Sequence, residues 1–306
     1  METTHRFIEQ DSRDLSEIVD NSIDFVVTSP PYPMIEMWDD VFCKMNPKIR
    51  DQLDQKNGYK AFDLMHEELD KVWDELDRVT TDDAIICINI GDATRKVSDF
   101  HLFHNHSRII EKFVELGYGT LPSVLWHKPT NKMNKFMGSG MIPPNAYVTL
   151  KHDRILIIRK NGTRNLTGEE KEKRYNSAYF WEERNTWFSD IWDSIKGEAQ
   201  NITDQSRERA GSYPVTIPYR LINMYSVQTD TVLDPFLGTG TTSLAAGISG
   251  RDSIGVDIQK DFIDSARDRL LNTVTNTSVS MRNKRINNHK EFLADSDRNP
   301  KYQAEN

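Results

Sequence analysis

The sequence predicts an α/β protein with a doubly wound, mostly parallel sheet. Short apolar runs rich in β-branched residues alternate along the 306-residue chain with amphipathic segments of helical period. Two of these runs end in the motifs "TSPPY" and "LGTGT". Both motifs suit the carboxyl ends of parallel strands, where α/β proteins bind their ligands. The length suits one large domain or two modest ones.

The first part of the chain contains two predicted strands and two predicted helices. The strands are "IDFVVTS" at residues 23–29 and "AIICINIGD" at 84–92, both short and apolar. Residues 62–79 place apolar side chains three and four positions apart, which predicts an amphipathic helix with an acidic outer face. A second helix is predicted over residues 101–117, with Gly117 ending it in the left-handed conformation.

The middle of the chain contains two predicted strands and an irregular region. Residues 120–128 and 153–160 have strand character and are expected to form a hairpin at a sheet edge. From residue 161 to about 211 the periodicity is lost, and aromatic and charged residues mix in "YNSAYFWEERNTWFSDIW".

The last part of the chain resumes the alternation. A helix is predicted over residues 215–226, a strand over 231–236, a helix after "GTG", a strand over 252–258 and a helix over 260–271. Residues 276–306 are polar and are predicted to form a flexible tail.

The charge of the chain is unevenly distributed. The composition is that of a globular protein, with 37% hydrophobic and 28% charged residues and a net charge of −8. Residues 36–92 contain 15 acidic and 7 basic residues, a balance of −8, whereas residues 128–174 contain 11 basic and 4 acidic residues, a balance of +7. The positive stretch either presents a basic face to phosphates or is an ordinary solvated face.

Targeting signals and metal-binding patterns are not expected. The N-terminus lacks the basic start and apolar core of a signal peptide, and no segment approaches membrane-spanning length, so a cytoplasmic protein without membrane association is predicted. Cys43 and Cys87 lie far apart without neighbouring histidine pairs, so neither a disulfide framework nor a metal site is predicted.

The segment "VLDPFLGTGTTSLAA" has the pattern of a strand, a glycine turn and a helix. Gly238 and Gly240 would let the backbone approach a nucleoside closely. A phosphate-binding loop would need a lysine that "GTGTTS" lacks, and the dinucleotide fingerprint would need a third glycine where Ser243 stands. Asp257 ends the next predicted strand and is well placed for ribose hydroxyls. The combination favours S-adenosylmethionine, while Gly-x-Gly alone also suits a plain tight turn.

The segment "TSPPY" forms a stiff corner after a strand, because each proline fixes its own φ and favours an extended residue before it. An exocyclic amine on a base is a poor nucleophile, since its lone pair is delocalised into the ring. An enzyme must therefore bind the amine hydrogens with fixed acceptors. The hydroxyl of Ser29 and the carbonyl of Pro30 suit this task, and Tyr32 can stack on the base. Read alone, the motif is more typical of an ordinary rigid turn with Tyr32 in the core.

Together the motifs resemble those of amino-group DNA methyltransferases from prokaryotic modification systems. "TSPPY" resembles their catalytic motif and "DPFLGTGTT" their cofactor motif, and the order of the two resembles the β class of the family. "SYPVTIPYRLI" is similar to the helix before the cofactor strand, although "RAGSYP" stands where the family often has "HPA". The resemblance covers residues 24–271 and implies a Rossmann-like sheet in circularly permuted order with a small target-recognition insertion.

The resemblance also implies a division of the chain and a set of site residues. Residues 1–127 would be the catalytic half, 128–212 a basic loop, sheet-edge strands and target-recognition region, 213–275 the cofactor-binding half, and 276–306 the tail. The implied catalytic residues are Ser29, Pro30, Pro31 and Tyr32, and the implied residues for S-adenosylmethionine are Asp234, Phe236, Gly238, Gly240, Thr241 and Asp257.

The serine of the motif bears on the substrate. In the family, Ser-Pro-Pro-Tyr usually accompanies methylation of the 4-amino group of cytosine, whereas Asp or Asn in the first position usually accompanies the 6-amino group of adenine. The resemblance therefore implies direct methyl transfer to a flipped-out cytosine of double-stranded DNA, which protects that DNA from a cognate restriction endonuclease. Adenine methylation, RNA methylation and a non-catalytic DNA-binding module remain alternatives, and both a monomer and a homodimer remain open.

The basic stretch is then expected to grip phosphates beside the pocket mouth. The aromatic region and "QNITDQSRER" are candidates for base reading, and the alternative is that Trp181, Trp187, Phe188 and Trp192 pack a small subdomain. The "GSG" sequence would give the basic loop room to move. The expected DNA-binding residues are Lys128, Lys132, Lys135, Arg164, Arg184, Arg207 and Arg209.

Overall fold

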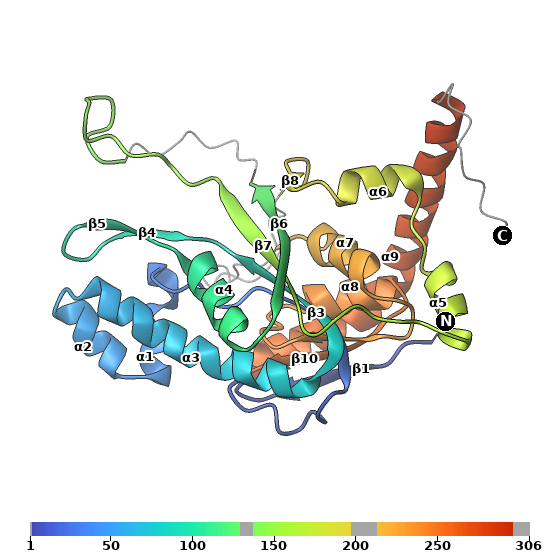
Figure 1. The fold of residues 1–306 in the computed structure, drawn as a ribbon, viewed down its shortest axis with the longest axis horizontal. Helices are drawn as coiled ribbons and strands as arrows, with labels where there is room; N and C mark the ends of the chain where they lie inside the picture. The colour runs from blue at the N-terminus through green and yellow to red at the C-terminus, as the bar shows by residue number, and fades with distance from the viewer. Residues whose placement is uncertain (1, 129–136, 197–212, 296–306) are drawn as a thin grey trace.

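The computed structural model describes residues 2–128, 137–196 and 213–295, and these residues are built around one large sheet (Figure 1). Within the described residues the sheet has eight strands in the order β1-β10-β9-β2-β3-β7-β6-β8. Its first five strands are parallel, which confirms the predicted doubly wound, mostly parallel α/β architecture. Strand β7 runs antiparallel to both β3 and β6. The strands are β1 His5–Glu9, β2 Ile23–Thr28, β3 Thr80–Ile90, β6 Gly119–His127, β7 His152–Arg159, β8 Ile191–Trp192, β9 Thr231–Asp234 and β10 Asp252–Asp257.

The two motif-bearing strands lie side by side in the centre of the sheet. Strand β2 pairs in parallel with β9, with Phe25 opposite Val232 and Val26 opposite Leu233. At their carboxyl ends the hydroxyl of Thr28 donates to the Oδ1 atom of Asp234 over 2.6 Å. The strands that follow β2 and β9 in the chain lie on opposite sides of this pair. Doubly wound sheets bind ligands at such a switch point, where the strand order reverses.

Helices cover both faces of the sheet over two separate hydrophobic cores. One face packs against α3 Gly58–Val79 and α4 Asn105–Glu115, and the other against α7 Thr216–Tyr225 and α8 Thr241–Ile248. Adjacent residues of β2 serve the two cores in turn, because side chains of a strand alternate between faces: Val26 lies in the first core, and Phe25 and Val27 lie in the second.

The remaining helices are short, with one exception. They are η1 Glu36–Trp38, α1 Asp39–Met45, α2 Lys48–Asp54, α5 Glu169–Asn176 and α6 Trp181–Trp187. The exception is α9 Lys260–Asp295, which packs against α8, the edge strand β1 and its neighbour β10. No helix in the described ranges combines the length and the apolar character of a membrane span.

The first strand and the start of α4 differ from the sequence-based expectation. Strand β1 was not expected, and it pairs with β10, so the N-terminus extends the cofactor-binding half of the sheet. The helix expected from residue 101 begins at Asn105, because Phe100–Phe103 forms strand β5 and pairs with β4 Ala93–Lys96. At its other end the helix terminates as predicted, with Gly117 at φ +88°.

Residues 276–295 of the predicted flexible tail are helical, so the expectation is corrected for them, and residues 296–306 lie outside the described residues. Contacts with α6 hold the distal part of α9: the guanidinium of Arg285 donates to both carboxylate oxygens of Glu183 at 2.5 and 2.7 Å. The ring of His289 stacks on Phe180 at 4.1 Å. A polar segment can thus be ordered by ion pairs and ring stacking that its own sequence does not reveal.

Two tryptophans of the aromatic region are packed, as the alternative interpretation expected, but they lie in a core of the main sheet and not in a separate small subdomain. Trp187 is 6% exposed and Trp192 is 1% exposed, and both lie in the second core. The indole nitrogen of Trp192 donates to the carbonyl of Trp187 over 3.0 Å. Trp181, by contrast, is 67% exposed. Trp187 and Trp192 are therefore structural, and only the exposed side chains of this region are free for other contacts.

Candidate active site

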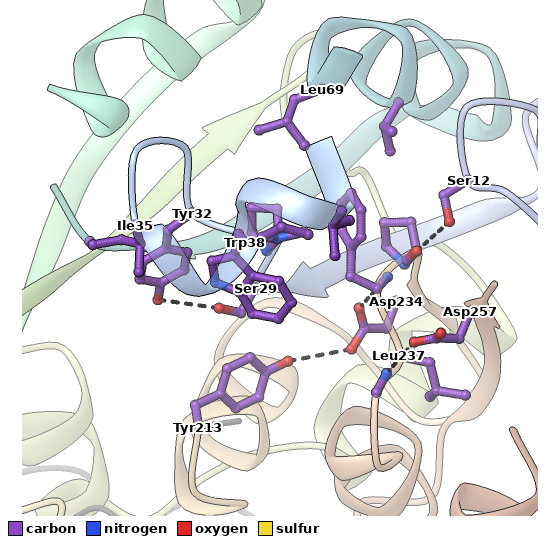
Figure 2. A pocket seen from close by; sticks show the side chains of 18 of the residues that line it. Ser12, Ser29, Tyr32, Ile35, Trp38, Leu69, Tyr213, Asp234, Leu237 and Asp257 are labelled. Carbon is purple, nitrogen blue, oxygen red and sulfur yellow. Dashed lines mark hydrogen bonds between the residues drawn. The ribbon is translucent and has the colours of Figure 1, made fainter. Parts of the chain in front are cut away.

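A cavity of about 450 Å³ lies at the carboxyl ends of β2 and β9 (Figure 2). Residues of both motifs line it, although they are about 200 positions apart in the sequence. Figure 2 shows Ser29 and Tyr32 at one side and Asp234 and Asp257 at the other. The expected site residues that line the cavity are Ser29, Pro30, Pro31, Tyr32, Lys128, Asp234, Phe236, Gly238, Thr241 and Asp257.

The hydroxyl of Ser29 is oriented by the neighbouring strand β3. Its Oγ atom lies 3.1 Å from the backbone carbonyl oxygen of Asn89, to which it donates, and 3.3 Å from the phenolic oxygen of Tyr32. The same Oγ atom accepts from the Nδ2 atom of Asn89 over 3.4 Å. Since its hydrogen is directed to the carbonyl and one lone pair to this amide, the second lone pair of Ser29 can accept a hydrogen bond from a molecule in the cavity.

The phenol of Tyr32 is held by two buried polar side chains. It donates to the Oδ2 atom of Asp153 over 3.0 Å and accepts from the Nδ2 atom of Asn89 over 2.8 Å. Burial and the carboxylate of Asp153 raise the pKa of Tyr32 well above its usual value, so the phenol stays protonated. Tyr32 is therefore a fixed ring and hydrogen-bond donor and does not act as a base.

Asp153 and Asn89 are site residues that sequence reasoning missed. Asp153 is 5% exposed, forms an ion pair with Lys128, and lies at the start of strand β7. Gly91 makes room for it, since a Cβ atom at this position would lie 2.6 Å from a carboxylate oxygen of Asp153. Asn89 lies near the end of a predicted buried strand, and a polar amide in that position indicates a ligand site, so the sequence held a signal for it. Asp153 gave no such signal, because its place depends on the antiparallel direction of β7.

Asp234 joins the two halves of the site. Its Oδ1 atom accepts from Thr28 at 2.6 Å and from the backbone N–H of Phe236 at 3.0 Å, and its Oδ2 atom accepts from the hydroxyl of Thr242 at 2.6 Å. Burial raises the pKa of Asp234 to about 6, although the hydroxyls of Thr242 and Thr28 oppose this shift. Both carboxylate oxygens are thus engaged within the protein.

We expect Asp234→Asn to make stability less dependent on pH. The folded protein binds the Asp234 proton more tightly than the unfolded chain does, so this group costs stability progressively as pH rises from about 4 to about 6, and the cost stays constant above. The variant should therefore gain about 1–3 kcal/mol relative to the parent between pH 4.5 and pH 7.5, measured by urea unfolding at several pH values. A difference between the two proteins that does not change with pH would contradict the raised pKa.

The glycine turn brings the backbone close to two other elements. Gly238 has φ +50° and its N–H donates to the Oδ2 atom of Asp257 over 2.9 Å. Gly240 has φ +77°, and a Cβ atom there would lie 2.6 Å from the Cβ of Ala266 in α9. Gly240 is not among the residues that line the cavity. Its requirement for glycine arises from the packing of the turn against α9.

The cofactor side of the cavity fits a nucleoside such as that of S-adenosylmethionine. Phe236, Leu237, Ile258 and Phe262 provide an apolar lining around the carboxylate of Asp257. The side-chain Oε1 atom of Gln10, which follows β1 and also lines the cavity, is buried and has no partner among the described residues. An orphan acceptor beside an apolar surface suits the amine or hydroxyl donors of a nucleoside. Gln10 escaped the sequence-based prediction because β1 itself was not predicted.

The expected DNA-binding residues are dispersed. Lys128 lies at the cavity wall in its ion pair with Asp153. Arg184 is exposed on α6, with its guanidinium 4.2 Å from the ring centre of Phe188, and is not part of the cavity lining. Lys132, Lys135, Arg207 and Arg209 lie outside the described residues.

The expectation for Arg164 is corrected. Its guanidinium lies 2.6 Å from a carboxylate oxygen of Asp230 and 3.7 Å from one of Asp24. Asp24 is the second residue of β2 and Asp230 directly precedes β9, so this cluster stands at the amino ends of the strands, on the opposite edge from the cavity. Arg164 therefore neutralises two internal carboxylates and does not grip phosphates beside the cavity mouth.

One group within the described ranges has the geometry of metal ligands. Ligand atoms of Asp92, His104 and His106 all lie within 4.8 Å of one another. Asp92 already accepts from the backbone N–H of His106 at 3.2 Å and lies 2.8 Å from its Nδ1 atom. These bonds fix the start of α4, and they account for the group without an ion.

Comparisons with known proteins agree with this geometry. The family model described as DNA methylase, for the N6 and N4 methyltransferases, matches residues 23–268. The Type II methyltransferase M.MthZI of Methanothermobacter thermautotrophicus is 51% identical over 100% of this chain and 86% of its own length. The Type II methyltransferase M.MjaI of Methanocaldococcus jannaschii is 49% identical over 85% of this chain and 89% of its own length.

A solved structure resembles the whole fold. The crystal structure of TTHA0409 from Thermus thermophilus, complexed with S-adenosyl-L-methionine, has a TM-score of 0.69 and 29% identity over 89% of this chain and 95% of that chain. With the family match, the motif-lined cavity and the nucleoside-compatible surface, this shows that the chain belongs to the N6 and N4 family of DNA methylases, which use S-adenosylmethionine as the methyl donor.

Proposed function

We propose that this enzyme methylates the 4-amino group of cytosine in double-stranded DNA. The observation that carries the proposal is the hydroxyl of Ser29, a neutral acceptor at the carboxyl end of β2, oriented by the carbonyl of Asn89 at 3.1 Å. The resemblance of "TSPPY" to the cytosine type of catalytic motif supports the same assignment. Methylation of the 6-amino group of adenine is the second candidate, because the matching family includes both activities.

The chain's role in catalysis is to orient the amine. The cofactor supplies an activated methyl group. The free lone pair of Ser29 and the carbonyl oxygen of Pro30 each accept one amine hydrogen, which turns the nitrogen lone pair out of conjugation with the ring. As the new N–C bond forms and the S–C bond breaks, the nitrogen becomes positively charged and then releases a proton to solvent. Tyr32 remains a protonated phenol throughout, since its pKa is raised.

Aromatic side chains hold the ring of the target base. Tyr32 and Trp38 both line the cavity, and Figure 2 shows them beside Ser29. Stacking on such a ring contributes about 1–3 kcal/mol per base. A base within a duplex cannot reach the cavity, so we infer that the target is flipped out of the stack before methyl transfer.

Residues on the other side of the cavity hold the cofactor. We infer that Asp257 and Gln10 bind nucleoside hydroxyl and amine groups, with Phe236, Gly238 and Thr241 shaping the surface. Gly240 sets the turn that starts α8. Asp234 lies at the cavity wall, but its oxygens are already bonded to Thr28, Phe236 and Thr242, so it acts by holding β9 to β2.

We expect Asp257→Ala to weaken the binding of S-adenosylmethionine by at least about tenfold, because it removes a charged acceptor from the nucleoside surface. Isothermal titration calorimetry measures this loss. Asp252→Ala is the matched control: Asp252 begins the same strand, and its carboxylate also accepts a backbone N–H, that of Thr4 at 2.7 Å, but it lies at the opposite edge of the sheet. Equal affinity in the two variants would remove Asp257 from the cofactor site.

The identity of the methylated base is tested directly. The enzyme is incubated with DNA and isotope-labelled S-adenosylmethionine, and the nucleosides are analysed by mass spectrometry. We expect labelled N4-methylcytosine, whereas labelled N6-methyladenine would establish the second candidate. Modification-sensitive sequencing of the same DNA identifies the recognition sequence.

The biological setting we propose is a restriction–modification system. Its support is that the relatives M.MthZI and M.MjaI are Type II methyltransferases that align with most of this chain. In such a system the methylated site would resist a restriction endonuclease of the same specificity. A cell that expresses this enzyme should then contain DNA that the matching endonuclease cannot cleave, and cleavage of that DNA would contradict the setting.

A further inference from the structure

A projecting loop, residues 137–150, carries large apolar side chains into solvent. We call it the finger, and Figure 1 shows it extending away from the sheet on the same side as the β4–β5 hairpin. Met141 is 83% exposed, Ile142 70% and Val148 85%. Soluble proteins rarely gather such side chains at the surface unless a partner covers them.

The finger is a built structure rather than a loose connection. Gly138 forms an isolated antiparallel bridge with Ala146, and the N–H of Ser139 donates to the carbonyl of Asn145 over 2.8 Å. Gly138 has φ +64°, and a Cβ atom there would lie only 2.1 Å from that same carbonyl oxygen. This bridge and this hydrogen bond close the base of the finger, and Met141 and Ile142 lie in the turn between Ser139 and Asn145.

A second contact anchors the finger to the rest of the protein. The ring of Tyr147 stacks on Phe100 of β5, with ring centres 4.5 Å apart and an interplanar angle of 3°. The β4–β5 hairpin thus supports the finger, which gives that hairpin a role. The apolar tip remains exposed although the base is packed.

The finger originates at the wall of the active-site cavity. Leu150, Lys151 and His152 line that cavity, and Lys151 accepts a backbone hydrogen bond from Lys128 at 2.8 Å. Ile142 lies eight residues before Leu150, and an extended chain covers about 3.3 Å per residue, so the tip can reach up to about 26 Å from the cavity wall. This range includes the neighbours of a base that has entered the cavity.

The charge of this part of the chain favours DNA as the partner. The sequence from Lys128 to His152 contains four lysines and no aspartate or glutamate, in a chain whose net charge is −8. A lysine-rich sequence that includes an apolar tip matches the phosphates and stacked bases of a duplex.

We propose that Met141 and Ile142 insert into the DNA base stack next to the target and occupy the space that the flipped base leaves. Proteins that deform DNA use apolar side chains as wedges between bases in this way. The inference deepens the proposed function and rests on it, since it requires a target base that leaves the duplex.

The test compares two duplexes that carry the recognition sequence. In one the target base has its normal partner, and in the other it lies opposite an abasic site, where flipping costs little. For the double variant Met141→Ser/Ile142→Ser we expect kcat/KM on the normal duplex to fall about tenfold or more, and kcat/KM on the abasic duplex to stay within about threefold of the parent. Val19→Ser is the matched control, since Val19 is 74% exposed and lies outside the cavity lining.

Several outcomes would overturn the proposal. An equal loss on both duplexes would mean that the finger contributes only general affinity, and no loss on either would mean that it does not engage the base stack. Conversion of a dimer to a monomer in analytical ultracentrifugation, with activity lost on both duplexes, would identify a second copy as the occupant. The target base is the one that mass spectrometry finds for the parent enzyme, so a finding of adenine would correct the proposed function and leave this test valid.

Discussion

Tyr32→Ala is expected to lower kcat/KM for methyl transfer by about 10²- to 10⁴-fold, because it removes base stacking worth about 1–3 kcal/mol and a buried hydrogen-bonded phenol whose loss costs about as much again. The binding of S-adenosylmethionine should stay within about threefold of the parent, since Tyr32 bonds to Asn89 and Asp153 and lies on the base side of the cavity. Single-turnover methylation and calorimetry measure the two quantities separately.

Tyr32→Phe and Ser29→Ala divide this effect into its parts. The phenylalanine variant keeps the ring and loses the bond to Asp153, so its kcat/KM should fall by only about tenfold. The alanine variant at Ser29 removes the acceptor and should lower kcat while sparing cofactor binding. If any of the three variants fails to bind S-adenosylmethionine while remaining folded, the assignment of "TSPPY" to the base is wrong.

Gly240→Ala is expected to destabilise the protein by about 3 kcal/mol and to lower its affinity for S-adenosylmethionine. Two costs add here: about 1 kcal/mol for an L side chain in the left-handed region, and about 1–3 kcal/mol for overpacking. The added Cβ would lie 2.6 Å from the Cβ of Ala266 and 2.9 Å from its Cα, and neither atom belongs to a flexible side chain. Urea unfolding measures the destabilisation.

Gly117→Ala isolates the backbone cost. Gly117 has φ +88°, close to the +77° of Gly240, but a Cβ atom there would meet nothing within 4 Å. This variant should lose only about 1 kcal/mol and keep its cofactor affinity. Equal destabilisation of the two variants would show that the contact between the glycine turn and α9 does not limit the choice of residue.

Local features of the sequence predicted the central elements correctly. The apolar runs of β2 and β9 are contiguous, and the prolines after one and the glycines after the other act on their own backbone. The end of α4 at Gly117 is equally local. Features that depend on one short segment are therefore readable without tertiary structure.

Long-range partners explain the failures. The interpretation of Arg164 as a phosphate ligand required knowledge of Asp24 and Asp230, which are 140 and 66 positions away. The interpretation of the last part of α9 as a tail fails because its partners, Glu182 and Glu183, belong to α6, about 100 residues earlier. Charge composition is the same for a solvated residue and for one paired inside the protein, so sequence alone does not separate the two.

The sequence by itself determined that the stiff corner "TSPPY" and the glycine turn "LGTGT" stand at strand ends, because each motif sets its own backbone geometry. Only the tertiary structure decided which distant residues complete them. Strand periodicity does not encode direction, and it is the antiparallel course of β7 beside β3 that brings Asp153 to the phenol of Tyr32. The parallel pairing of β2 with β9 likewise places "TSPPY" against "LGTGT" and encloses one cavity between them.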